Sequence, residues 1–564
     1  MQSCAVIGCG PAGMAASTVL RQSGLLVTCF DLAPEPGGIW ASNARDIFSS
    51  RGCVSPIYPS MRCVLPKELM AFSDVRFDYA VAQFPHHTAV RHYLHQYAAQ
   101  KGVRCLTRFN TKVESARFDS VDRMWKIISV NVVSGDVMEW SFDKVCVCTG
   151  QTQEVRFPAG MQEALEGYVR EGGEVHHAAH VKDFRSFHKK RVVVVGNGVS
   201  AYDYCVELKR MGAEVYQSIT APAPSSASSG PQTGFACSSL TAELWKDMVV
   251  APWGRGGATK EVSDVRVAAD AVTRIAGLAA RLPWLHNDAH AAKDVVRKWL
   301  RYRNTRLEVI PAVGLPLDND GRGLRFAAAP SVRRSTADIV AEAKERVGHL
   351  DVSSAAPSAE VFVDKVDAVI CATGYNRRYP FLHPNVRRVL EEDQLLLTSS
   401  NSSSPFSTSS DAAGGPPAAS RHGLYLGTLW CAEPSLALVG YQKDLLPPFL
   451  LFEAQARFIA YAFTQRMPIP DGAEEMRAKE DALVKANPAL ADLYSGDGVG
   501  LHSAAYFNVL QHELGVSSRD TYTSKVLQRH KWLLCSTLVR IYHKCRSMAP
   551  LKRKEQHLLF SNKI

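Results

Sequence analysis

The sequence predicts an α/β protein, because two strand–glycine loop–helix–strand units can be read along the chain. In the first unit an apolar strand enters a glycine loop made of Gly8, Cys9, Gly10, Pro11, Ala12 and Gly13. A helix of small residues follows, and the next apolar strand ends in Asp31. The second unit begins at Arg191, and its loop consists of Gly196, Asn197, Gly198, Val199, Ser200 and Ala201. Strand, loop, helix and strand in this order are typical of Rossmann-type, three-layer dinucleotide-binding domains.

The glycines of the first loop each have a separate physical role. Gly8 permits a tight turn, Gly10 lets the backbone approach a pyrophosphate, and Gly13 lets the helix pack closely on the strand. The helix N–H groups would then face the phosphates. Asp31 is placed to accept a hydrogen bond from a ribose hydroxyl.

The second unit repeats this pattern with Ala201 at the third position, which still packs closely. A purely structural strand–helix–strand unit is the alternative. Two apolar strands also end in Thr-Gly, before Gly150 and at Thr373-Gly374. Such strand ends place backbone beside a cofactor at the carboxyl edge of a sheet.

Composition sets limits on the class of protein. A chain of 564 residues is too long for one ordinary core, so two or more domains are expected. The hydrophobic and charged fractions, 46% and 21%, are those of a soluble globular protein. Fourteen cysteines without a C-x-x-C pair argue against a disulfide framework and against a zinc site, so no metal is predicted.

The basic surplus is concentrated at the C-terminal end. Residues 521–564 carry ten Lys and Arg against the single acid Glu555, so they hold nearly all of the net charge of +10. A near-neutral body argues against nucleic-acid binding. We expect a cytoplasmic protein, with peripheral membrane contact through residues 525–564 and an ordinary packed helix as equal alternatives. Peroxisome-type import through the final Asn-Lys-Ile is a weaker alternative.

Other helices and strands are predicted from the spacing of apolar residues and from glycine and proline stop signals. Residues 88–101 and 451–465 predict amphipathic helices. Residues 103–106, 125–133 and 138–142 predict strands. Residues 398–420 are of low complexity and predict a disordered loop.

These motifs together resemble the flavin-containing monooxygenase family. The resemblance rests on the first glycine loop, CFDLAPEPGGIW, PKELMAFSD, VVVVGNGVSAYD, CATGY and the C-terminal GYQ and FEAQARFIAYA, in family order over roughly residues 3–480. It implies that the NAD(P)-binding domain is inserted into the FAD-binding domain. The expected limits are 1–165 and 345–480 for the FAD domain and 166–344 for the NAD(P) domain, with a helical insertion at about 221–305 and a mainly helical, basic C-terminal extension at 481–564.

The resemblance also implies cofactors and an activity like that of dimethylaniline monooxygenases. NADPH, with NADH as an alternative donor, reduces FAD, and the reduced flavin forms a C4a-hydroperoxide with O2. A soft nitrogen or sulfur nucleophile of a small molecule is then oxygenated. The first glycine loop and Asp31 would hold FAD, with Gly38, Ile39 and Trp40 along the flavin, and the second loop would hold the nicotinamide dinucleotide. The oligomeric state cannot be read from the sequence.

The chain departs from the family pattern at three places. The F-x-G-x-x-x-H signature is degraded, and both His177 and His180 fit its histidine. Val64 stands where the family has an asparagine beside the flavin. The stretch after the second unit's second strand, residues 217–220, has neither the family arginine for the 2′-phosphate of NADP nor an acid.

These departures leave other functions open. One is an NAD(P)H oxidase that releases hydrogen peroxide because Val64 offers no hydrogen bond. Another is a catalytically idle flavin-binding protein. A Baeyer–Villiger monooxygenase is disfavoured, because the signature region lacks the tryptophan of that group.

Overall fold

The computed structural model describes seven stretches of the chain: residues 1–41, 55–218, 312–326, 361–399, 423–442, 448–490 and 503–515. Short gaps interrupt several of them, among them residues 64, 66, 68–69 and 197–198. Val64, Asn197, Gly198, the expected insertion at 221–305, residues 400–420 of the expected loop and the basic segment 525–564 therefore lie outside the described residues.

The first unit is built on a seven-stranded sheet in the order β18-β19-β20-β7-β1-β2-β3. Its strands are β1 (Ser3–Ile7), β2 (Leu26–Phe30), β3 (Thr107–Arg108), β7 (Lys144–Val147), β18 (Leu424–Tyr425), β19 (Leu429–Trp430) and β20 (Leu436–Leu438). The strands from β20 to β3 run parallel, and β18 and β19 continue the sheet antiparallel. The carboxyl ends of the parallel strands therefore meet at one edge.

Both faces of this sheet are covered, which explains its apolar strands. Cys4 and Val6 face the helices α1 (Pro11–Gln22), α3 (His87–Gln100) and α12 (Pro448–Phe463). Ala5 and Ile7 face the antiparallel sheet β4 (Thr111–Asp119), β5 (Met124–Asn131) and β6 (Val137–Phe142). Helices α13 (Gly472–Ala486) and α15 (Ser503–Glu513) extend the helical layer. The predicted three-layer α/β class is confirmed.

The second unit is a parallel sheet in the order β12-β11-β10-β16-β9. Its strands are β9 (Glu174–His177), β10 (Arg191–Val195), β11 (Glu214–Ser218), β12 (Ala312–Val313) and β16 (Ala368–Cys371). Val192 and Val194 pack toward α6 (Val199–Arg210), η2 (Ala178–His180) and η3 (Phe184–Phe187). Val193 and Val195 pack toward α5 (Met161–Arg170) and the small sheet β13 (Pro316–Asp320), β14 (Gly323–Phe326) and β15 (Val361–Val363).

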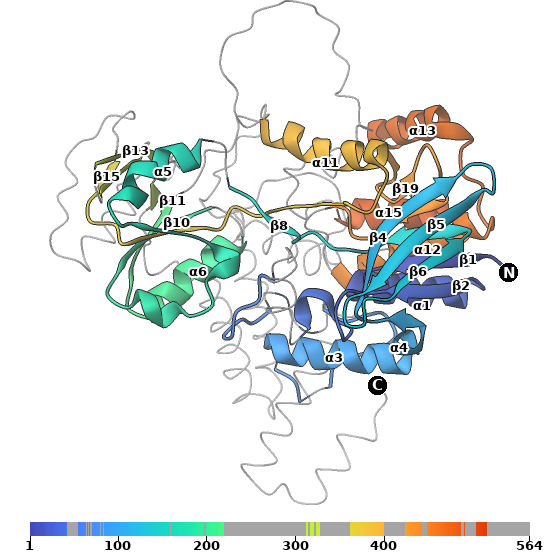
Figure 1. The fold of residues 1–564 in the computed structure, drawn as a ribbon, viewed down its shortest axis with the longest axis horizontal. Helices are drawn as coiled ribbons and strands as arrows, with labels where there is room; N and C mark the ends of the chain where they lie inside the picture. The colour runs from blue at the N-terminus through green and yellow to red at the C-terminus, as the bar shows by residue number, and fades with distance from the viewer. Residues whose placement is uncertain are drawn as a thin grey trace, which may run out of the picture.

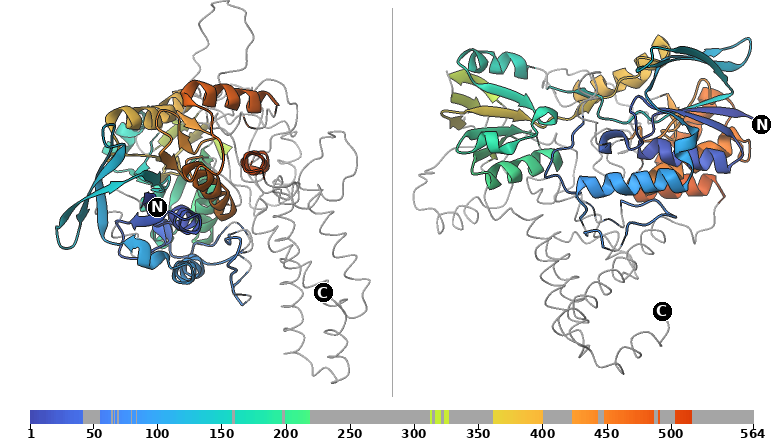
Figure 2. Two further views of the ribbon diagram at one scale, coloured as in Figure 1. Left: turned by 90° about the vertical axis from the view of Figure 1, so that its right-hand side faces the viewer. Right: turned by 60° about the horizontal axis from the view of Figure 1, so that its bottom comes forward.

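Among the described residues, two chain segments connect the units, and they lie at other positions than the limits expected at 165 and 344. Helix α5 crosses the limit at 165 and packs in the second unit, and β16 pairs with β10 although it lies beyond the limit at 344. The chain returns to the first unit only after β16, where β17 (Tyr375–Asn376) pairs antiparallel with β8 (Glu154–Val155). Figures 1 and 2 show the two units side by side, with β8 and this returning chain between them.

Most local elements agree with the sequence predictions, with one correction. The helix predicted at 88–101 is α3, and the helix predicted at 451–465 is α12. The strand predicted at 103–106 is wrong, because these residues form the short helix α4 (Val103–Leu106). Gly102 adopts φ +64° and turns the chain after α3, and the Cys105 N–H then donates to its carbonyl at 3.2 Å. The first residues of the expected loop, 398 and 399, end helix α11 (Pro384–Ser399).

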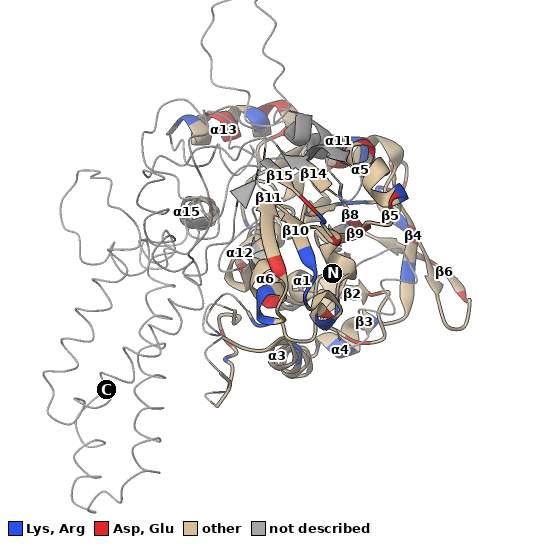
Figure 3. Cartoon of the chain, turned by 90° about the vertical axis from the view of Figure 1, so that its left-hand side faces the viewer, with Lys and Arg blue, Asp and Glu red and all other residues tan. Residues whose placement is uncertain are grey.

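Charges on the described elements are mixed rather than gathered. Figure 3 shows acidic and basic residues interspersed over both units, in line with a near-neutral body. Among the described helices, none combines the length and the apolar character that a bilayer crossing would need.

Candidate functional site

The first glycine loop turns at the carboxyl end of β1. Gly8 has φ +103°, and a Cβ there would lie 2.5 Å from the Cys148 carbonyl oxygen. A Cβ on Gly13 would lie 1.7 Å from the Gly8 carbonyl oxygen. Both glycines are therefore required by the packing of the protein itself, and they bring the start of α1 against the end of β1.

Gly10 and Gly38 form an open backbone cradle in front of α1. A Cβ on Gly10 would meet the Gly38 Cα at 3.6 Å, and a Cβ on Gly38 would meet the Gly10 Cα at 3.0 Å. The Gly37 N–H donates to the Cys9 carbonyl at 3.0 Å, which fixes η1 (Gly38–Trp40) beside the loop. Helix α1 begins with Pro11, and no side chain caps its N-terminus, so a ligand could accept from its first N–H groups. A pyrophosphate fits such a cradle.

Asp31 closes the loop from the end of β2. Its carboxylate accepts hydrogen bonds from the Cys9 N–H and, at 2.7 Å, from the Ala33 N–H, and the residue is 8% exposed. Burial raises the pKa of Asp31 to about 6, although the two N–H donors act in the opposite direction. A carboxylate has about four acceptor positions, so it could also accept a ribose hydroxyl.

Asp31 gives a prediction for the pH dependence of FAD affinity. If a ribose hydroxyl donates to the carboxylate, FAD prefers the ionised form, and its affinity falls up to about tenfold per pH unit below about pH 6. The apoprotein shows the opposite sign: its free energy of unfolding falls as the pH rises from about 4 to 6, because the protonated form is favoured when folded. Fluorescence titrations with FAD between pH 5 and 8 measure the first effect. In Asp31→Asn the slope should vanish, and an equal slope there would rule out Asp31 as its source.

The second glycine loop repeats this geometry at the end of β10. Gly196 has φ +137°, and a Cβ there would lie 2.5 Å from the Ala372 carbonyl oxygen, the same distance as in the first unit. The Gly196 N–H donates to the Ser218 carbonyl at 2.9 Å, as Gly8 donates to Phe30 at 2.7 Å. Val199 and Ser200 begin α6, and Ala201, the next residue of this helix, is fully buried. The described part of this loop therefore also suits a dinucleotide pyrophosphate.

Gln217 occupies part of the stretch in which the family arginine was expected. Its side-chain amide donates to the Gly196 carbonyl at 2.9 Å, and Ser218 is fully buried. Both residues therefore support the loop, and neither offers a positive charge to a 2′-phosphate.

Thr373 and Gly374 lie at the end of β16, where they hold the connection between the units. The Arg156 guanidinium donates twice to the Thr373 carbonyl, at 3.1 and 2.9 Å, and the Thr373 hydroxyl donates to the Arg156 carbonyl at 2.5 Å. The Arg156 N–H also donates to the Gly374 carbonyl at 3.1 Å. Their predicted contact with a cofactor stays a prediction. Arg156 was missed by sequence reasoning, because it belongs to no motif.

The structure separates the two histidines that fit the degraded signature. His177 is 1% exposed, and its Nε2 lies 3.1 Å from the Gly374 carbonyl oxygen, whereas His180 is exposed. Burial lowers the pKa of His177 to about 4, so it is neutral at pH 7. At Gly173 a Cβ would lie 2.2 Å from the Tyr168 ring. Gly173 and His177 therefore carry the structural part of the signature.

A glutamine network that sequence reasoning did not assign lies at the same edge of the first sheet. The Gln151 amide donates to the carbonyls of Gly440 and Gln442, both at 2.6 Å. Gln455 of α12 accepts from the Gly440 N–H at 2.9 Å and donates to the Gln442 side chain at 2.8 Å. The GYQ motif was the available signal. Among the described residues, no group of His, Cys, Asp and Glu could hold a metal ion.

Comparison with known proteins finds similarity to flavin-containing monooxygenases. Residues 1–226 match the family model described as flavin-binding monooxygenase-like. The chain is 32% identical to flavin-containing monooxygenase FMO GS-OX-like 9 of Arabidopsis thaliana over 234 residues, which cover 38% of this chain and 49% of the relative. It is 25% identical to human putative dimethylaniline monooxygenase (N-oxide-forming) 6 over 390 residues, 68% of this chain and 63% of the relative. The matches thus span about half to two thirds of these relatives.

Solved structures share the fold. S-allyl-L-cysteine S-oxygenase from Allium sativum aligns with a TM-score of 0.56 at 19% identity, over 97% of this chain and 98% of that one. Tmm from Pelagibacter sp. strain HTCC7211 aligns with a TM-score of 0.53 at 17% identity, over 90% and 86%. By the matching family model and these relatives, the chain is similar to flavin-containing monooxygenases, and the family model covers its residues 1–226.

Proposed function

We propose that the chain binds FAD at the first glycine loop and NADPH at the second, and oxygenates a soft nitrogen or sulfur atom of a small molecule. The carrying observation is the repeated geometry of Gly8 and Gly196, whose Cβ positions would each lie 2.5 Å from a carbonyl oxygen of the neighbouring Thr-Gly strand end. The human relative is named for N-oxide formation, which supports the nitrogen class.

The reaction consumes one O2, one NADPH and one proton for each substrate oxygenated, and yields NADP⁺ and water. FAD would supply the chemistry, accepting a hydride and passing electrons to O2. The chain's own residues would bind and orient the cofactors. The Gly10–Gly38 cradle would hold the FAD pyrophosphate and Asp31 its ribose, and Gly196 with the start of α6 would hold the nicotinamide dinucleotide.

NADPH is allowed rather than strongly selected at the second loop. Gln217 and Ser218 carry no charge and support the loop backbone, so they neither attract nor repel a 2′-phosphate. We therefore propose NADPH as the donor and NADH as a usable substitute.

The test is purified protein incubated with FAD, NADPH and a thioether or tertiary amine, with sulfoxide or N-oxide and hydrogen peroxide both quantified. Oxygenated product in proportion to NADPH supports the proposed function. Peroxide without product would indicate an NAD(P)H oxidase. Bound flavin that NADPH never bleaches would indicate an idle binding protein.

Val64 favours the oxidase outcome in part, because valine cannot replace the hydrogen bond of an asparagine. A lost hydrogen bond of up to about 3 kcal/mol corresponds to roughly a hundredfold in rate. We predict that much of the NADPH consumed by the wild type appears as peroxide and that Val64→Asn shifts electrons to oxygenated product. The peroxide-to-product ratio measures this. Val64→Leu is the matched control and should stay uncoupled, and tight coupling in the wild type would contradict the prediction.

Membrane contact through residues 525–564 stays a separate proposal, as does cytoplasmic localisation. The basic segment lies outside the described residues, so only its composition supports the membrane contact.

A further inference from the structure

A segment of the first unit docks on the second unit away from the β8–β17 connection. We call residues 55–61 the strap. The Lys182 ammonium, from the chain between η2 and η3, donates to the strap carbonyls of Ser55 at 2.6 Å and Ile57 at 2.8 Å. The Ser60 hydroxyl donates to Glu207 of α6 at 3.0 Å.

The centre of the strap is an aromatic anchor. Tyr58 is 5% exposed and belongs to the core cluster of the second unit, although it lies about 120 residues earlier in the chain than that cluster's other buried members. Its ring meets Phe184 and Tyr204 edge-to-face, with centroids 5.1 and 5.5 Å away. Its hydroxyl donates to Asp203 of α6 at 3.5 Å. Burial of an aromatic ring in this way gives the contact both energy and a defined geometry.

Both ends of the strap are fixed in the first unit. The Ser55 hydroxyl donates to the Ile39 carbonyl of η1 at 3.2 Å. At the other end the His87 N–H, at the start of α3, donates to the Met61 carbonyl at 3.1 Å. The strap therefore joins the backbone beside the proposed flavin cradle to α6, the helix that begins at the second glycine loop. In Figure 1 the chain before α3 reaches α6 in this way.

The strap supplies a contact that can fix the angle between the two units, which the paired strands β8 and β17 do not. A two-stranded connection leaves domains free to turn about it, and relative motion is the default unless another contact fixes the angle. Hydride transfer requires the two reacting rings in near-contact, and a displacement of about 1 Å can cost roughly a hundredfold in rate. A contact that locates α6 relative to η1 therefore affects the step between the cofactors directly.

We propose that the strap sets the position of the second unit relative to the flavin and that Tyr58 and Lys182 are positioning residues for hydride transfer. The inference rests on the proposed function for its two cofactors. The docking contacts do not depend on that function.

The experiment compares Tyr58→Ala, Tyr58→Phe and Lys182→Met in the full-length chain loaded with FAD. Tyr58→Phe keeps the buried ring and removes the hydroxyl that donates to Asp203 at 3.5 Å. Tyr216→Ala is the matched control, because Tyr216 is a partly buried tyrosine of the same unit and packs in its other cluster. Anaerobic stopped-flow absorbance measures flavin reduction by NADPH, and calorimetry measures NADP⁺ affinity.

Tyr58→Ala and Lys182→Met should slow flavin reduction at saturating NADPH at least tenfold, with FAD retention and NADP⁺ affinity within threefold of wild type. Tyr58→Phe should reduce within threefold of the wild-type rate. Wild-type rates in Tyr58→Ala, or equal slowing in Tyr216→Ala, would overturn the proposal.

A second readout needs no turnover. Spin labels at Gln100→Cys, at the exposed end of α3, and at Val169→Cys, on α5 with 50% exposure, report the distance between the units. In a background whose other reactive thiols are replaced by serine, Tyr58→Ala should broaden the distance distribution and Tyr216→Ala should not. An unchanged distribution in Tyr58→Ala would overturn the strap. If NADPH fails to reduce wild-type flavin while the distribution still broadens, the proposed function fails and the strap stands.

Discussion

Replacing Gly10 with valine is expected to abolish FAD binding while leaving the protein folded. The backbone at Gly10 has φ −74°, which any residue adopts, and the nearest atom to an added Cβ is the Gly38 Cα at an ordinary 3.6 Å. The valine side chain would instead fill the cradle between the two glycines. We expect the dissociation constant for FAD to rise at least a hundredfold, or about 3 kcal/mol. The flavin absorbance of purified protein and a fluorescence titration of the apoprotein measure it.

Gly13→Ala is the contrasting control in the same loop. Its Cβ would lie 1.7 Å from the backbone oxygen of Gly8, so α1 must move and the fold itself is damaged. Gly13→Ala should therefore lower the thermal unfolding temperature, whereas apo Gly10→Val should unfold near the wild-type apoprotein. Retention of FAD by Gly10→Val would contradict the placement of the pyrophosphate.

The glycine loops could be predicted from the sequence because their constraints are local. The chain turns with positive φ at Gly8 and Gly196, a conformation that glycine adopts without penalty, and the strand, loop and helix of each turn are adjacent in the chain. The burial of both faces of β1 and β10 was readable for the same reason, since each strand is a continuous apolar run. The order of strand, loop, helix and strand along the chain was enough to predict the α/β fold class.

The domain limits could not be predicted as well, because they depend on pairing between distant segments. Strand β16 lies about 170 residues after β10, and only its register with Val192–Val195 shows that it belongs to the second sheet. The repeated Thr-Gly strand end did indicate this pairing. The residue before each Thr-Gly lies against the first glycine of a loop: Cys148 against Gly8, and Ala372 against Gly196. His177 and His180 could likewise be separated only by burial against the chain at Gly374.

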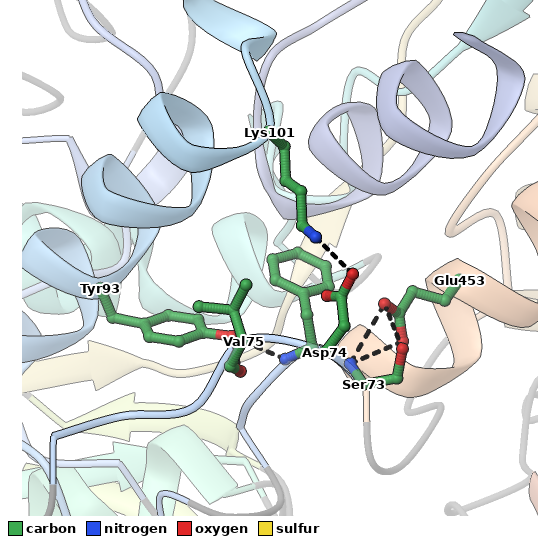
Figure 4. Close-up of polar contacts among 7 residues, drawn as sticks. Ser73, Asp74, Val75, Tyr93, Lys101 and Glu453 are labelled. Carbon is green, nitrogen blue, oxygen red and sulfur yellow. Dashed lines mark hydrogen bonds and ion pairs between the residues drawn. The ribbon is translucent and has the colours of Figure 1, made fainter. Parts of the chain in front are cut away.

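Glu453 of α12 contacts Ser73, 380 residues earlier in the chain, and no local sequence pattern predicts this contact either. The Ser73 N–H donates to both carboxylate oxygens, at 3.1 and 3.0 Å, and its hydroxyl donates at 2.9 Å. Figure 4 shows this segment between α12 and the residues near α3, where the Tyr93 hydroxyl donates to the Val75 carbonyl at 2.9 Å. The segment follows position 64 in the sequence, and its anchors hold this part of the chain to α12 and α3.

Replacing Glu453 with alanine is expected to lower the free energy of unfolding of the first unit by about 2–3 kcal/mol, because the amide and hydroxyl of Ser73 lose a charged acceptor that is only 5% exposed. Urea unfolding followed by flavin fluorescence measures this for the flavin-bound unit. Glu453→Gln keeps a carbonyl acceptor and should recover part of the loss.

The ion pair between Lys101 and Asp74, next to the Glu453–Ser73 contact, provides a control for the size of the stability loss. Lys101 Nζ lies 2.5 Å from Asp74 Oδ2, but the two side chains are 21% and 46% exposed. A pair this exposed contributes at most about 1 kcal/mol, since solvent screens it and both side chains lose freedom. Lys101→Ala should therefore change the unfolding midpoint less than Glu453→Ala, although its ion pair is the shorter contact. Solvent screening is the reason to expect the smaller loss in Lys101→Ala. An equal or larger loss in Lys101→Ala would therefore show that the ion pair, rather than the buried carboxylate of Glu453, fixes the segment.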